Sequence, residues 1–205
     1  MAGSGSESAE EMVREATTAL VVVLVVIALV WVLQIVNWVD GYGLDRSYGI
    51  VPHDLARLPD VLVAPFLHLS WTHIEANSGP LFVFGFLAAF RGVKRFVGVT
   101  VVTVLASGLA VWLFQSPGEL TVGASGVIYG YFGYVVVKGL FDRRLLDVLV
   151  GAVMALSFAY ILVAAVPGTP GVSWIGHLGG LGGGILSGWL FRDSGRQKED
   201  ADSVL

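Results

Sequence analysis

The sequence contains no cysteine and few charged residues. None of its 205 residues is Cys, and 14% are charged. The absence of cysteine excludes disulfide bonds, thiolate catalysis and cysteine-ligated metal sites. An average soluble domain is about 25% charged, whereas 55% of this chain is hydrophobic and its mean hydropathy is +0.77. This composition predicts a polytopic membrane protein.

The chain also lacks a basic patch and a basic leader. Its formal net charge is -4, and no base-stacking module indicates nucleic acid as a partner. Residues 1–16 are polar and acidic, and a long apolar run follows them. A secretory signal has a basic start and a short apolar core, so we expect the first apolar segment to be retained. No sequence motif calls for a metal or cofactor, and we expect neither.

Six apolar segments organise the rest of the chain: residues 17–38, 74–90, 96–114, 122–137, 145–166 and 172–191. A spanning helix needs about 20 residues, and five segments approach this length. The fourth, with about 16 residues, covers only about 24 Å of a bilayer core about 30 Å thick. The pattern predicts an all-α, six-transmembrane-helix bundle over residues 17–192, between polar tails at 1–16 and 193–205. The fourth helix should begin within the membrane's thickness.

The basic residues predict the orientation. Ten of the twelve fall on one side of the six segments: Arg14, Arg91, Lys94, Arg95, Lys138, Arg143, Arg144, Arg192, Arg196 and Lys198. Cytoplasmic loops carry the excess of Lys and Arg. We therefore expect a multi-pass protein of the cell membrane with both termini in the cytoplasm. The outward ends of the second, fourth and sixth segments then place His73, Ser125 and His177 on the same side of the membrane.

A serine between glycines, in Gly123-Ala124-Ser125-Gly126, begins the fourth segment. A serine hydroxyl becomes a useful nucleophile when a base takes its proton. His177, near the start of the sixth segment, suits that task because an unperturbed histidine has a pKa of about 6.5. No acidic residue lies within these two segments, so we predict a Ser–His dyad. Tyr129, one turn after Ser125, is placed to stack on the imidazole.

Two further polar residues, His73 and Asn77, share one face of the second segment at spacing i, i+4. Both can donate hydrogen bonds to an oxyanion. Each taken alone is equally compatible with a structural hydrogen bond between helices. Glu75 lies between them, and at i+2 we expect it to face away from both.

Glycines recur every fourth residue along the sixth segment, at Gly176, Gly180, Gly184 and Gly188. The fourth segment has a similar set in Gly126, Gly130 and Gly133. Such faces let two helices approach closely. We expect the fourth and sixth helices to pack together and so bring Ser125 near His177.

These motifs together resemble the rhomboid intramembrane serine proteases. The shared pattern is Pro65-Phe66-Leu67-His68, then His73-x-x-x-Asn77, Gly123-Ala124-Ser125-Gly126 and His177-x-x-Gly180-x-x-x-Gly184. The resemblance implies a water-filled cavity with Ser125 as nucleophile and His177 as base. It assigns His73 and Asn77 to the oxyanion and Tyr129 to packing on the base, with Gly123 in the serine motif.

The resemblance further implies a structural role for His68 near the cavity mouth and a movable cap over residues 167–171. Substrates would be membrane proteins with a transmembrane helix, cleaved within the lipid bilayer. The first loop lacks the Trp-Arg pair that many members carry. Two other functions remain open: a catalytically inactive rhomboid-like protein that binds membrane proteins, and a small transporter.

Overall fold

The computed structural model describes residues 3–169 and 171–193, so nearly all of the predicted C-terminal tail lies outside the described residues. Within them every regular element is a helix, apart from an isolated antiparallel bridge between Ile50 and Thr121. The elements in order are α1 (Gly3–Val39), α2 (Gly43–Tyr48), η1 (Leu55–Leu62), η2 (Ala64–Phe66), α3 (Trp71–Ala89), α4 (Val93–Phe114), α5 (Ser125–Asp142), α6 (Leu145–Ser157), η3 (Ala159–Ala165) and α7 (Trp174–Leu190). The three η elements are 3₁₀ helices.

Among the described residues, two helices are long and apolar enough to cross a membrane, namely α1 over Ala9–Val39 and α4 over Val93–Phe114. A third candidate is α6 together with η3, which meet at a bend of 63°. The fifth apolar segment is therefore broken rather than one continuous helix. The remaining long helices α3, α5 and α7 have 19, 18 and 17 residues and carry more glycine and polar side chains.

Two helix ends differ from the sequence prediction. Helix α1 already begins at Gly3, so the polar stretch predicted as a tail continues the apolar helix. A formed helix gains one hydrogen bond for each residue added, and Ala, Glu, Met and Arg in this stretch favour helix. Helix α5 continues past residue 137, the predicted end of the fourth segment, to Asp142. Lys138 and Asp142 lie one turn apart in this extension and form an ion pair.

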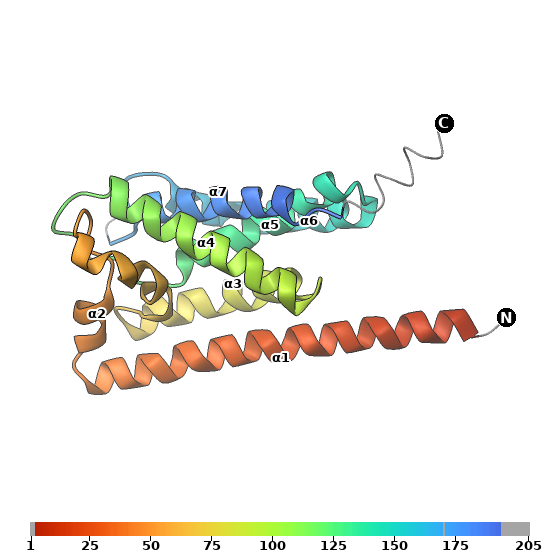
Figure 1. Cartoon of the computed structure of the whole chain (residues 1–205), viewed down its shortest axis with the longest axis horizontal. Coiled ribbons are helices and arrows are strands. Elements are labelled where there is room, and N and C mark those ends of the chain that lie inside the picture. Colours follow the sequence, from red (N-terminus) through yellow and green to blue (C-terminus); the bar gives the residue numbers. More distant parts are fainter. Residues whose placement is uncertain (1–2, 170, 194–205) are drawn as a thin grey trace.

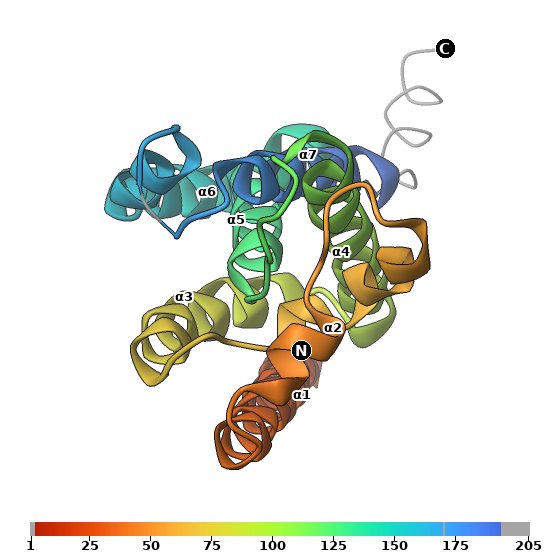
Figure 2. The ribbon, with the colours of Figure 1, turned by 90° about the vertical axis from the view of Figure 1, so that its left-hand side faces the viewer.

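Helix α5 forms the centre of the bundle, with α3, α4, α6 and α7 around it (Figure 2). It packs most closely against α7, where a Cβ added to Gly180 would lie 1.9 Å from the Gly126 carbonyl oxygen. A Cβ at Gly184 would lie 1.9 Å from the Gly130 oxygen. The predicted glycine faces are thus confirmed: they bring two backbones into contact that no larger residue allows.

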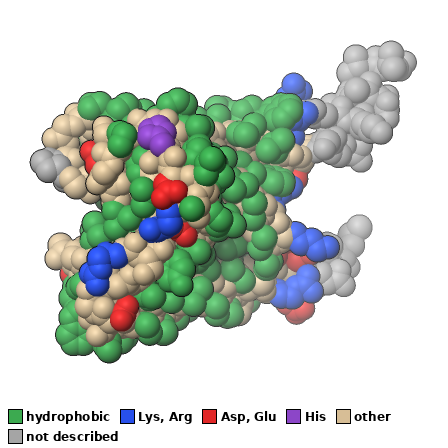
Figure 3. Space-filling model, turned by 60° about the vertical axis from the view of Figure 1, so that its left-hand side comes forward, with side chains coloured by type: hydrophobic (Ala, Val, Ile, Leu, Met, Phe, Trp, Pro, Cys, Tyr) green, Lys and Arg blue, Asp and Glu red, His purple; other side chains and the backbone are tan. Residues whose placement is uncertain are grey.

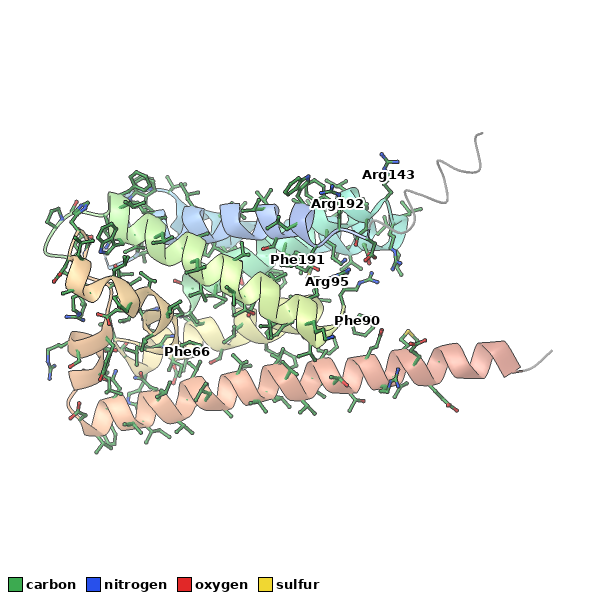
Figure 4. All side chains as sticks on the ribbon, viewed as in Figure 1. Phe66, Phe90, Arg95, Arg143, Phe191 and Arg192 are labelled. Atoms are coloured by element: carbon green, nitrogen blue, oxygen red, sulfur yellow. The ribbon has the colours of Figure 1, made fainter. Side chains whose placement is uncertain are left out.

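The bundle has two chemically distinct ends. The loop end contains residues 40–70 and 115–124, and the basic end contains the N-terminus of α1 together with Arg95, Arg143 and Arg192 (Figures 1 and 4). Between the two ends the surface is largely hydrophobic (Figure 3), with side chains such as Val25, Val101 and Val153 at least half exposed. Such a belt is too extensive for a water-exposed surface and indicates a membrane protein.

Candidate active site

A cavity of about 950 Å³ lies among the helices at the loop end. Its walls come from α3, α4, α5, η3 and α7 and from the segments before α5 and α7. The predicted residues Ser125, His177, His73, Asn77 and Tyr129 all line it. Side chains from three helices separated by up to about a hundred positions are thus gathered on one space.

Ser125 is the first residue of α5, which places its amide ahead of the helical hydrogen-bond ladder. The first such bond runs from the Ile128 N–H to the Ala124 oxygen, at 3.0 Å. Gly123 shapes the approach to the helix with φ of +125°, a conformation that residues with a Cβ rarely adopt. Its N–H donates to the Ala64 carbonyl at 3.0 Å, which ties the serine motif to η2.

His177, in the first turn of α7, contacts Ser125 directly. Its Nε2 lies 2.8 Å from the Ser125 Oγ, and its Nδ1 lies 2.8 Å from the Ala164 carbonyl oxygen. A carbonyl only accepts hydrogen bonds, so the proton of the neutral ring belongs on Nδ1. Nε2 is then free to accept from the serine hydroxyl. The Ala164 carbonyl therefore orients the imidazole. Because it is a backbone group, no side-chain pattern in the sequence pointed to it.

Tyr129 stacks on His177 as predicted. The ring centroids are 4.1 Å apart and the planes differ by 8°. The Tyr129 hydroxyl donates to the Ile161 carbonyl oxygen. Ile161 and Ala164 both belong to η3, so the 3₁₀ turn holds the base and its stacking partner at once.

His73 and Asn77 lie together beside the serine motif. A Cβ added to Gly123 would lie 2.8 Å from the His73 Nε2 and 3.8 Å from the Asn77 Nδ2. The Asn77 Nδ2 is buried, and no described residue accepts from it. A buried amide without a partner is costly, and Asn77 is among the residues that line the cavity. Glu75 is exposed on α3, consistent with its expected direction away from the pair.

His68 differs in position from what the resemblance implied. It is fully buried, does not line the cavity, and accepts from the Ala124 N–H at 3.4 Å through Nε2. Its ring meets that of His73 edge to face, with centroids 4.9 Å apart. Burial, and after it the charge of His73, lower the pKa of His68 from 6.5 to about 3. A neutral His68 thus contacts both Ala124 of the serine motif and the ring of His73.

Four polar residues at the cavity were missed by sequence reasoning. The Ser107 hydroxyl of α4 donates to the Gly176 carbonyl at 2.9 Å. Gln115 donates to the Thr121 hydroxyl at 2.8 Å and accepts from the Ser173 hydroxyl. These bonds join α4, Thr121 in the segment before α5, and the N-terminus of α7.

The predicted cap, residues 167–171, runs along the cavity. Gly168, Thr169 and Gly171 line it, and residue 170 lies outside the described residues. Gly168 and Gly171 have φ of +124° and +73°, which residues with a Cβ rarely adopt. At these two glycines the loop borders the cavity with backbone alone.

Comparison with known proteins places this architecture in a family. The family model described as a Rhomboid domain matches residues 55–194. An uncharacterized protein of Mycobacterium tuberculosis is 36% identical over 176 residues, covering 82% of this chain and 73% of that protein. A Bacillus subtilis protein provisionally named a rhomboid protease is 27% identical over 161 residues, 77% of each chain. Rhomboid-like protein 11 of Arabidopsis thaliana is 27% identical over 151 residues, 67% of this chain and 54% of that protein. The chain belongs to the rhomboid family.

Proposed function

We propose that this protein is an intramembrane serine endopeptidase that cleaves transmembrane segments of other membrane proteins. The observation that carries the proposal is the 2.8 Å contact between Ser125 Oγ and His177 Nε2, on a ring whose other nitrogen is held by a carbonyl. This is the geometry of a nucleophile paired with its base. Family membership includes serine intramembrane proteases and inactive relatives, and the intact dyad favours the former.

Acylation begins when Ser125 Oγ attacks the carbonyl carbon of the scissile peptide. The hydroxyl proton passes to His177 Nε2, and the imidazolium is stabilised by the Ala164 carbonyl at Nδ1. When the tetrahedral intermediate collapses, the C–N bond breaks and the leaving amine takes the proton from Nε2. Water then attacks the resulting ester by the same steps in reverse, and Ser125 is regenerated.

The oxyanion is the carbonyl oxygen after attack, and it needs donors placed beforehand. We assign this role to the unpartnered Asn77 Nδ2, to His73 and to the Ser125 N–H at the start of α5. Tyr129 restricts the imidazole by stacking, and Gly123 keeps the space clear where its Cβ would meet His73. His68 is assigned a supporting role behind His73.

The arrangement in the membrane follows from the same proposal. We infer six crossings, formed by α1, α3, α4, α5, the bent pair α6–η3, and α7, within a protease domain over residues 17–192. The basic end lies in the cytoplasm with both termini, because it carries most of the Lys and Arg. The catalytic cavity then opens toward the outside, where water is available for hydrolysis.

Labelling with a fluorophosphonate probe in detergent tests the proposal, since the probe phosphorylates serines activated by a base. We expect labelling at Ser125, confirmed by peptide mass spectrometry, and its loss in Ser125→Ala and His177→Ala. Ser116→Ala is the matched control, because Ser116 also lines the cavity but is not among the described hydrogen-bond partners of His177. Absence of labelling in the folded wild type would favour the inactive binding protein or the transporter.

A further inference from the structure

Three carboxylates at the basic end form ion pairs within the chain. Asp142 pairs with Lys138 and Asp147 with Arg91. Asp193, just after α7, lies 2.5 Å from the Arg95 Nη2 and 3.6 Å from the Arg144 Nη2. The pairs of Asp147 and Asp193 connect the first turns of α4 and α6 and the end of α7. These three carboxylates are therefore already paired with arginine or lysine.

Two further arginines, Arg143 and Arg192, form no ion pair with the residues that the structure describes. They are neighbours in space, since the Asp193 N–H donates to the Asp142 Oδ1 at 2.8 Å and each arginine is next to one of these residues. Figure 4 shows both at the same end of the bundle. Two arginines carried by neighbouring backbone segments can together supply donors for a doubly accepting anion such as a phosphate.

Apolar side chains surround the two arginines. Leu140, Leu145 and Leu146 flank Arg143 with exposed fractions of 63%, 74% and 72%, and Leu190 beside Arg192 is 47% exposed. The Arg192 guanidinium also lies over the half-exposed ring of Trp189, 4.8 Å from its centroid. Tryptophan is enriched where a membrane meets water. A ligand here would contact cationic donors and an apolar surface together. A phospholipid has both an anionic headgroup and apolar acyl chains, whereas a free ion has no apolar part.

The backbone at Arg143 is a second unusual feature. Its φ of +54° places it in the left-handed region at the C-cap of α5. Glycine is the usual residue at such helix ends because a Cβ is disfavoured there. Arginine here therefore holds a backbone conformation that glycine would adopt with less strain.

We propose that the basic end binds an anionic phospholipid, with its headgroup phosphate between Arg143 and Arg192 and its acyl chains along Leu140, Leu145 and Leu190. Clustered arginines just beyond a membrane helix attract anionic headgroups. The site is remote from the Ser125 cavity, which opens at the other end of the bundle. Lipid binding is therefore independent of the proposed protease activity.

Native mass spectrometry of the detergent-purified full chain, mixed with equal amounts of phosphatidylglycerol and phosphatidylcholine, tests the site. We expect the wild type to retain phosphatidylglycerol selectively. Arg143→Gly and Arg192→Gln should each lower that retention about fivefold, the share expected for one arginine at an anionic surface. Arg46→Gln is the matched control, an exposed arginine at the loop end, and should leave retention unchanged.

Folding is monitored separately by thermal unfolding in lipid-free detergent. Arg143→Gly relieves the left-handed backbone and should unfold no earlier than the wild type, so its loss of lipid cannot be attributed to misfolding. Equal retention of the two lipids by the wild type, or unchanged phosphatidylglycerol retention in Arg143→Gly, would overturn the proposal. Thermal stabilisation by inorganic phosphate equal to that by phosphatidylglycerol would also overturn it, because the acyl chains would then contribute nothing.

Discussion

The ring of Tyr129 lies parallel to the ring of His177, with centroids 4.1 Å apart and planes 8° from parallel. The same tyrosine donates its hydroxyl to the Ile161 carbonyl, one turn of η3 before the Ala164 carbonyl that holds the His177 Nδ1. The base is thus restrained on one face and at one edge by a single 3₁₀ element.

This arrangement separates two contributions of Tyr129. Tyr129→Phe keeps the stacked ring and loses only the hydroxyl bond, so cleavage should stay within a few-fold of the wild type. Tyr129→Ala also frees the imidazole, and misplacement of a catalytic group by about 1 Å can cost about 100-fold. We expect kcat to fall by 10- to 100-fold in the alanine variant, measured with a single-helix membrane substrate. Equal losses in both variants would show that the hydroxyl, and not the stack, positions the base.

The Ser125–His177 contact predicts strong non-additivity. Ser125→Ala and His177→Ala should each abolish cleavage while leaving thermal unfolding close to that of the wild type. The double variant should be little worse than either, because two residues that act as one unit lose their joint contribution once. Cleavage rates of the three variants check this. Losses that multiply in the double variant would mean that the residues act separately.

Asn77→Ala should lower kcat more than it raises KM. An oxyanion donor interacts most strongly with charge that develops in the transition state. Removal of one donor in a soluble protease costs about 10²–10³ in kcat, and we expect less here because His73 and the Ser125 amide remain. Since Nδ2 has no partner among the described residues, its removal should leave stability unchanged. A fall in thermal stability that accounts for all the lost activity would assign Asn77 a purely structural role.

The contact between α5 and α7 predicts that a single methyl group is too large at Gly180. Its Cβ would lie 1.9 Å from the Gly126 oxygen, so the helices must separate. Gly180→Ala should cost about 1–3 kcal/mol through overpacking and lower cleavage by moving His177 away from Ser125. Gly182→Ala is the control on the same helix, since nothing lies within 4 Å of its added Cβ. Thermal unfolding of both variants in the same detergent tests this prediction. Equal stability of the two variants would contradict close packing of α5 against α7 at Gly180.

Burial of His68 predicts a loss of stability in acid. Its pKa is about 3 in the fold against 6.5 for an unperturbed histidine. Between these values the unfolded chain binds more protons than the folded one, so stability falls as pH falls from about 6.5 toward 3. One proton gives at most about 1.4 kcal/mol per pH unit.

Thermal unfolding of the wild type and His68→Gln at pH 8, 6 and 4 isolates this contribution. Glutamine can still accept from the Ala124 N–H but does not titrate. We expect the variant to lose less stability than the wild type on acidification. Parallel pH profiles for the two proteins would show that His68 is not the group responsible.

Much of the fold could be predicted because it depends on local patterns. The linear sequence shows the apolar segments, the glycine faces of residues 176–188 and 126–133, and the motif residues Ser125 and His177. Helix ends were predicted less well. The extension of α5 to Asp142 depends on an ion pair with Lys138, and the break between α6 and η3 at Phe158 has no proline or glycine to announce it.

The chemical groups and the helices that carry them follow from the amino-acid sequence, because side-chain identity and hydrophobic length are properties of the chain. How those groups are held depends on the packing of segments that are distant in sequence. The Ala164 and Ile161 carbonyls that orient the base come from backbone that every residue possesses, so their role depends on where the η3 turn lies against α7. His68 likewise became a buried support beneath His73, rather than a residue at the cavity mouth, through packing among segments distant in sequence.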